Sequence, residues 1–330
     1  MDIIHFPLKV LNKIYGRIFN IKEDSFIPSD IPASEEQASR WIYELLTSDA
    51  PCMIGRFGST ELNTTLNAQS HIKKKHSIID YIRHKEYGWW WNPDLLYAIQ
   101  NNAGFFPVNE DMLIKYSERM LEDMKELDLL GDFTRSVRYV EPILEGVRRV
   151  HIKDLEPIYG SSPWTRALKG KKVLVVHPLA DLIRYQYEVN REKLFANPDM
   201  LPEFELVVVP AVQSLGGDNS QFANWFEALD WMENEIDKKD YDICLIGCGA
   251  YGFCLAAHCK RMGKIGFHIG GYLQYMFGII GSRWNDPNYG VERWGIPKGK
   301  YSNNINQFWV RPDKKYIPLN ASKVENGCYW

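Results

Sequence analysis

The second half of the chain alternates short apolar runs with amphipathic stretches. Apolar runs of strand length lie at 169–178, 204–212, 241–249 and 264–271, and helical patterns follow at 222–236 and 250–263. Continuous apolar runs are typical of strands buried on both faces of a parallel sheet. The pattern therefore predicts an α/β fold with a Rossmann-like, doubly wound and mostly parallel sheet, whose core spans about 169–284.

The first half of the chain is expected to add helices to this core. A helix at 34–47 begins after Ser34, with Gln37 placed for a capping interaction. A brief buried strand at 52–54 precedes another helix, and 93–130 carries two helical patterns. We expect an N-terminal helical segment at 1–33 and one domain at 34–330, with a helical insertion at about 80–165 and an ordered C-terminal wrap at 285–330.

The N-terminal segment combines apolar and basic residues at helical spacing. Its apolar positions include Val10, Leu11, Ile14 and Ile18, and Lys9, Lys13 and Arg17 lie between them. Two interpretations remain open. Residues 1–22 form either an interfacial helix attracted to anionic lipid or a helix packed on its own domain. No stretch of the sequence is long and apolar enough to span a bilayer.

Composition excludes several classes of protein. The chain has 330 residues, 45% of them hydrophobic and 25% charged, and a net charge of -3. These values indicate a folded protein, neither disordered nor coating nucleic acid, so no nucleic-acid partner is expected. The six cysteines form no C-x-x-C pair, and no secretory leader is visible. We therefore expect reduced, buried thiols and a cytoplasmic location; Cys254 and His258, four residues apart, suit either zinc or packing.

Gly247, Gly249 and Gly252 have the G-x-G-x-x-G spacing of a dinucleotide-binding turn. A dinucleotide site also needs an acidic residue at the end of the next strand, where this chain has His268. That difference disfavours a nicotinamide oxidoreductase. A strand-to-helix turn of this kind also suits a phosphate or diphosphate, here near Gly247, Gly249 and Ala250. The alternative is that the glycines only allow close packing of helix and strand.

Ligands of doubly wound sheets bind beyond the carboxyl ends of the strands. The residues at those ends are therefore the candidates for donor binding: His177, Gln213, Ser214, Gly247, Gly249, Ala250, Tyr251, Gly270 and Gly271, with Gln274 and Arg283 for sugar or base contacts. His268 is a candidate base. Three tryptophans at 87–93 suggest an acceptor-sugar platform, a membrane-facing patch or a packed lid.

The stretch "IGRFGSTEL" at 54–62 resembles the Arg-Phe-Gly-Asp-Gly-Glu element of bacterial glycosyltransferases of the GT-D fold. Longer blocks from about residue 50 onward resemble GT-D-like proteins of bacterial capsule and lipopolysaccharide gene sets. The resemblance implies a nucleotide-sugar donor whose diphosphate is bound near Arg56, Gly58 and Ser59, with Glu61 as a catalytic or metal-binding residue. In that family the Asp-x-Glu pair is associated with a divalent metal.

Ser59 stands where the family element has aspartate. One carboxylate beside a hydroxyl is a poor site for Mn²⁺ or Mg²⁺, which favour several oxygen ligands. Two arrangements remain open. Either Glu61 binds the metal together with another carboxylate such as Asp218, or Arg56 and helix N-termini neutralise the diphosphate without a metal.

The resemblance implies a glycosyltransferase that moves a sugar from a donor such as a UDP-sugar to a capsule, O-antigen or lipid-linked glycan acceptor. We expect it in the cytoplasm, at the inner face of the plasma membrane if the N-terminal helix binds lipid. A homodimer is an open alternative. The competing interpretations are another nucleotide-dependent sugar-modifying enzyme, such as an oxidoreductase, and a catalytically inert component of a capsule-assembly complex.

Overall fold

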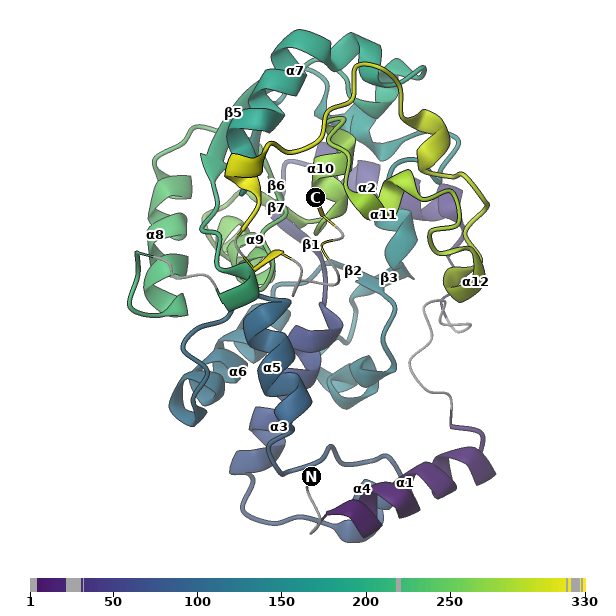
Figure 1. Cartoon of the computed structure of the whole chain (residues 1–330), viewed down its shortest axis with the longest axis vertical. Coiled ribbons are helices and arrows are strands. Elements are labelled where there is room, and N and C mark those ends of the chain that lie inside the picture. The colour runs from purple at the N-terminus through teal and green to yellow at the C-terminus, as the bar shows by residue number, and fades with distance from the viewer. Residues whose placement is uncertain are drawn as a thin grey trace.

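A computed structural model describes residues 5–21, 31, 33–217, 221–318, 320–321, 327 and 329–330. Its centre is a seven-stranded sheet in the order β3-β2-β1-β7-β6-β4-β5, and every neighbouring pair is parallel (Figure 1). The strands are β1 (Cys52–Arg56), β2 (Leu129–Asp132), β3 (Arg148–His151), β4 (Lys172–His177), β5 (Glu205–Pro210), β6 (Ile243–Ile246) and β7 (Ile265–His268). The expected α/β fold with a doubly wound parallel sheet is confirmed.

Helices cover both faces of the sheet, which explains the continuous apolar runs. One apolar core lies between the sheet and α3 (Ser59–Ile72), α5 (Pro93–Asn101), α6 (Glu110–Met124), α8 (Trp225–Asp237) and α9 (Tyr251–Arg261). The core on the other face includes α2 (Glu35–Thr47), α7 (Ala180–Leu194), α10 (Tyr272–Met276) and residues of the C-terminal wrap. Ser34 caps α2 as expected, since its hydroxyl accepts a hydrogen bond from the Gln37 amide.

The segment 80–165 is more than the expected helical insertion, because it supplies strands β2 and β3. The second helical pattern expected within 93–130 ends at Met124, and the Leu129–Leu130 pair lies in β2. Both leucines are fully buried and pair with β1. Asp128 fixes the junction, because its carboxylate accepts a hydrogen bond from the Met53 amide at 2.8 Å. The helical spacing of apolar residues thus continues past the end of α6 into Leu129 and Leu130, which belong to the sheet.

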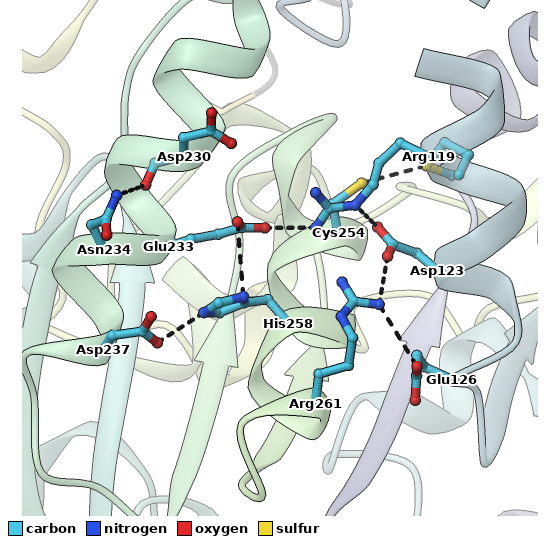
Figure 2. A network of polar contacts seen from close by, with 11 residues as sticks. Arg119, Asp123, Glu126, Asp230, Glu233, Asn234, Asp237, Cys254, His258 and Arg261 are labelled. Carbon is cyan, nitrogen blue, oxygen red and sulfur yellow. Dashed lines mark hydrogen bonds and ion pairs between the residues drawn. The ribbon is translucent and has the colours of Figure 1, made fainter. Parts of the chain in front are cut away.

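A network of ion pairs joins α6, α8 and α9 (Figure 2). The buried Asp123 carboxylate accepts a hydrogen bond from Arg119 at 2.7 Å and forms an ion pair with Arg261 at 2.8 Å. Arg119 also binds Glu233 at 2.6 Å. His258 contacts Asp237 at 2.8 Å, so the imidazole belongs to this network. Cys254 instead lies beside the Met120 sulfur, which favours packing over zinc binding for this pair.

The C-terminal segment packs against α7. Gln186 of α7 is fully buried and donates to the carbonyls of Gly278 and Phe308, which ties the wrap to the domain. Trp309 donates to the Leu194 carbonyl. Two short helices lie before and within the wrap, α11 (Ser282–Asn285) and α12 (Val291–Trp294).

The other features concern cysteines, membranes and the N-terminus. The five cysteines in the described part of the chain are buried and form no disulfide with one another; Cys328 lies outside it.

None of the described helices is long and apolar enough to cross a bilayer. The N-terminal pattern forms α1 (Phe6–Ile18), which packs beside the short helix α4 (Ile78–Ile82), while residues 1–4 and 22–30 are not described.

Candidate functional site

A hollow opens at the carboxyl edge of the sheet, between the ends of β4 and β6. The chain leaves β4 toward β5 and leaves β6 in the opposite direction toward β7, so this is the topological switch point where ligands of doubly wound sheets bind. It is partly open to solvent and is lined by residues from 102–103, 177–179, 212–215 and 247–249, with Tyr251, Gly271, Gln274, Tyr329 and Trp330. Eight of the predicted site residues meet here: His177, Gln213, Ser214, Gly247, Gly249, Tyr251, Gly271 and Gln274.

The glycine turn before α9 is shaped by close packing. Gly249 has φ +59°, and a Cβ there would lie 2.9 Å from the Ala103 carbonyl oxygen. A Cβ at Gly247 would lie 2.7 Å from the Gly270 carbonyl oxygen. The glycines therefore do allow close packing. Because they carry no side chains, they also leave the backbone accessible at the hollow. The Ala250 amide donates to the Ala103 carbonyl at 3.0 Å. This amide is therefore not available to an anion, contrary to the expectation from the sequence.

His177 ends β4 and presents a neutral imidazole to the hollow. Burial lowers the pKa of His177 to about 3. Its Nδ1 accepts a hydrogen bond from the Leu179 amide at 3.0 Å, which places the ring proton on Nε2. His177 is therefore a hydrogen-bond donor for an oxygen-rich ligand, with no charge of its own at neutral pH.

Ser214 and Tyr251 support the wall of the hollow. Their hydroxyl oxygens are 3.1 Å apart, and Ser214 donates to the Gly104 carbonyl at 2.6 Å. The Tyr251 ring stacks on Trp225 with centroids 5.0 Å apart. These contacts hold the 102–104 loop against α9. The two hydroxyls therefore stabilise the wall of the hollow.

Gln213 borders a second hollow beside the first. This one is lined by residues 210–213, Gln221, Phe222 and Trp231. The rings of Phe222 and Trp231 have centroids 5.7 Å apart. Val212 and Gln213 line both hollows, so the two hollows share a wall.

Arg56, His268 and Gly270 form a neighbouring group at the ends of β1 and β7, outside the lining of the first hollow. The Arg56 guanidinium lies against Gly270, where a Cβ would be 2.9 Å from Nη1. Burial and the nearby Arg56 charge lower the pKa of His268 to about 3. A Cβ at Gly252 would be 2.2 Å from His268 Nδ1, so this imidazole packs under the first turn of α9. His268 is thus placed beneath the hollow.

Glu61 is turned back onto its own helix. Gly58 is the N-cap of α3, and a Cβ at Gly58 would fall on the Glu61 carboxylate. A carboxylate in this place stabilises the amino end of the helix. Ser59 is exposed, and none of the three residues lines the first hollow. Asp218 lies outside the described residues, and the described part of the chain holds no cluster of three His, Cys, Asp or Glu residues suited to a metal ion.

Tyr329 lies between the lining of the hollow and Arg283. Gln274 donates to the Tyr329 carbonyl at 3.0 Å, and the Tyr329 ring fills the space that a Cβ at Gly271 would need. The Arg283 guanidinium lies 4.3 Å from the centre of the Tyr329 ring. Trp330 lines the hollow itself. In Figure 1 the C-terminus accordingly lies over the carboxyl edge of the sheet, near α10 and β1.

Glu156 is a candidate that the sequence does not reveal. Burial raises the pKa of Glu156 to about 8, while Tyr301 and the charges of Arg283 and Arg56 act in the opposite direction. The Tyr301 hydroxyl donates to the carboxylate at 2.6 Å. The partner lies 145 residues further along the chain, so no local pattern marks this carboxyl. Glu156 therefore interacts electrostatically with both arginines.

Comparisons with models of known protein families, with curated proteins and with solved structures gave no match.

Proposed function

We propose that the chain is a glycosyltransferase that uses a nucleotide-sugar donor such as a UDP-sugar and an acceptor glycan of a bacterial surface polysaccharide. One observation carries the proposal. The hollow lies at the switch point between β4 and β6, with the bare glycine turn and the amino end of α9 on one side and the neutral donor His177 on the other. Helix N-termini and backbone amides favour phosphate groups.

The reaction requires stabilisation of a leaving diphosphate. The acceptor oxygen bonds to the anomeric carbon, and the bond from that carbon to the diphosphate oxygen breaks. The electron pair leaves with the nucleoside diphosphate, and the acceptor proton passes to a base. Positive groups near the leaving oxygen therefore act on the transition state. Arg56 and Arg283 supply such charge, and the carboxylate of Glu156, in its ionised form, is the group that we favour as base.

The second hollow suits the rest of the donor. Phe222 and Trp231 present aromatic rings, on which bases and sugars stack, and Gln213 and Gln221 offer amide groups for their hydroxyls or ring edges. We place the base or the sugar there and the diphosphate at the α9 turn. A Mn²⁺ or Mg²⁺ ion bound by Glu61 and Asp218 is the alternative way to neutralise the diphosphate. The experiment below tests the need for such a metal.

A panel of nucleotides screened by melting temperature tests the proposal. UDP or GDP should raise the melting temperature, because a ligand that binds only the folded state stabilises it, and NAD should not. Parallel samples with and without Mn²⁺ report the need for a metal. Sugar-nucleotide hydrolysis should then be lost in Arg56→Ala and weakened in Glu61→Ala.

Two outcomes would replace the proposal. Stabilisation by NAD, with reduction of NAD by a sugar, would assign the hollow to an oxidoreductase. If no nucleotide changes the melting temperature, an inert component of an assembly complex becomes the better interpretation. Two features favour the inert component: Ser59 stands in the place of an aspartate, and the Glu61 carboxylate is turned back onto its own helix at Gly58.

A further inference from the structure

Helix α1 is attached to the domain by one face. Asn12 donates to the Tyr81 carbonyl at 2.7 Å, and the Asn12 carbonyl lies 3.0 Å from His84 Nε2. His5 stacks on Trp90 with ring centroids 4.3 Å apart, and Gly16 lets His84 approach closely. Positions 5, 9, 12 and 16 share one side of an α-helix. The face that α1 uses for packing is therefore mainly polar.

The opposite face of α1 is apolar and exposed. Leu11, Ile14 and Ile18 keep 47%, 48% and 70% of their surface accessible, and Phe6, Val10 and Phe19 are exposed as well. A helix stabilised only by its own domain would turn this stripe inward. Here the hydrogen bonds of Asn12 and the small Gly16 fix the helix with the stripe outward. The apolar stripe therefore has another use than packing on the domain.

Helix α4 and the residues before it extend this surface. Ile78 and Ile79 are 52% and 61% exposed, and they follow the exposed Lys73–Lys75 run. Figure 1 shows α1 and α4 side by side at the end of the molecule away from α7, and their residues contact each other. A second element thus adds apolar and basic groups next to the first.

The charges around the exposed apolar residues are mostly positive. Residues 5–21 and 71–86 carry eight Lys and Arg side chains and two carboxylates, the half-exposed Asp80 and the buried Glu86, which pairs with Lys73 at 3.1 Å. The whole chain has a net charge of -3, so this concentration of positive charge is local. Lysine and arginine beside an apolar helix face are the signature of binding to the interface of an anionic bilayer.

We propose that the α1–α4 surface, defined as the exposed residues of 6–19 with Lys73–Lys75, Ile78 and Ile79, docks the protein on an anionic lipid bilayer. The apolar stripe inserts at the boundary of headgroups and acyl chains, and the lysines contact lipid phosphates. Two of the tryptophans at 89–91 lie against this surface: Trp90 contacts His5 and Lys9, and Trp89 stacks on His76. Trp89 and Trp90 thus support α1 through its N-cap residue, His5.

Vesicle sedimentation with the full chain tests this proposal. The protein should bind vesicles of phosphatidylcholine mixed with phosphatidylglycerol and bind phosphatidylcholine vesicles much more weakly, with loss of binding at high salt. Ile14→Ser combined with Ile18→Ser should weaken binding by about tenfold or more. Lys13→Gln combined with Arg17→Gln should weaken binding to the anionic vesicles alone, by roughly tenfold.

Tyr185→Ser combined with Val189→Ser is the matched control, because both residues are exposed on α7, outside the proposed surface. This variant should bind vesicles as the parent does. Melting temperatures of all variants should equal that of the parent, since the changed residues are exposed. Equal vesicle binding by the Ile14/Ile18 variant and the parent would overturn the proposal. So would a parent dimer that this variant converts to monomer without any vesicle binding, which would assign the surface to a second copy of the chain.

Discussion

The Arg56 guanidinium rests directly on the backbone of Gly270. Gly270 has φ +75°, and a Cβ there would approach Arg56 Nη1 to 2.9 Å and Cδ to 3.4 Å. The absence of a side chain at the end of β7 therefore determines where the positive charge of β1 lies. This contact connects the arginine at the end of β1 to the loop whose carbonyl packs on Gly247, at the edge of the hollow.

Gly270→Ala should move Arg56 and weaken nucleotide binding. Gly263→Ala is its matched control, because Gly263 has φ +76° and open space around it. Both variants should lose about 1–2 kcal/mol of unfolding free energy, since alanine is strained at positive φ. Only Gly270→Ala should weaken UDP binding, measured by calorimetry. Equal affinities in the two variants would show that Arg56 takes no part in binding.

Tyr329→Ala should increase the affinity for UDP. The Tyr329 ring fills the space between Gly271 and Arg283, so a ligand that reaches both the hollow and the arginine must displace it. A site that is only partly open binds with an affinity reduced by the open fraction. We expect a gain of roughly fivefold in a titration. Tyr97→Ala, an exposed tyrosine on α5, should leave the affinity unchanged, and a weaker affinity in Tyr329→Ala would instead make the ring part of the binding site.

Glu156 should make the protein less stable at alkaline pH. Its pKa is raised from 4.5 to about 8 in the folded state, so the native protein holds a proton that the unfolded chain releases. This contribution to stability is complete below pH 4.5 and disappears as the pH rises through about 8. Between pH 6 and pH 9 the parent should lose about 2 kcal/mol, allowing for partial exposure, in urea unfolding. Glu156→Gln should show a flatter profile over this range, and an unchanged slope would contradict the assignment.

His177 and His268 should make the stability of the folded protein depend on pH in the acidic range. Their pKa values are lowered to about 3 in the folded state, so unfolding at low pH lets both imidazoles take up protons. The stability from these groups is present above about pH 6.5 and is lost as the pH falls toward 3. In acid titrations followed by circular dichroism, His177→Gln should unfold at a lower pH than the parent, provided that both have equal stability at pH 7. A midpoint at the parent's pH would exclude His177 as a source of the acid sensitivity.

Asp123→Ala should be strongly destabilising, because it leaves Arg119 and Arg261 beside a buried site without their shared carboxylate (Figure 2). Removal of one partner from a buried ion pair costs about 3–5 kcal/mol. Glu122→Ala is the matched control, since the Glu122–Lys125 pair on the same helix is exposed. Its change should stay within about 0.5 kcal/mol. Thermal unfolding of the two variants measures the difference.

The sequence reveals the strands that have a full apolar run, and it misses those that do not. β4, β5, β6 and β7 follow from continuous apolar residues. β2 directly follows the helical pattern of α6, which absorbs its leucines, and β3 contains two arginines and a histidine, so neither shows a continuous apolar run. Their place in the sheet depends on pairing with β1, which is a tertiary effect.

The candidate site is divided in the same way. The rule that ligands bind at strand ends finds His177, Gln213 and the glycine turn, because those residues follow recognisable strands. It cannot find Glu156, whose pKa depends on burial, or Tyr329, whose contact with Gly271 brings together residues far apart in the chain. It also overestimates Ala250, whose amide is taken by Ala103.

The position of β7 affects how the chain is made. β7 is the last strand in the sequence, yet it lies between β1 and β6 and pairs with both. During synthesis on the ribosome, β1 and β6 each wait with an open, hydrogen-bonding edge until residues 265–268 leave the exit tunnel. More than two hundred residues separate Cys52 from its partner Ile265. A nascent chain of this topology is therefore a natural client for chaperones that shield unpaired strands.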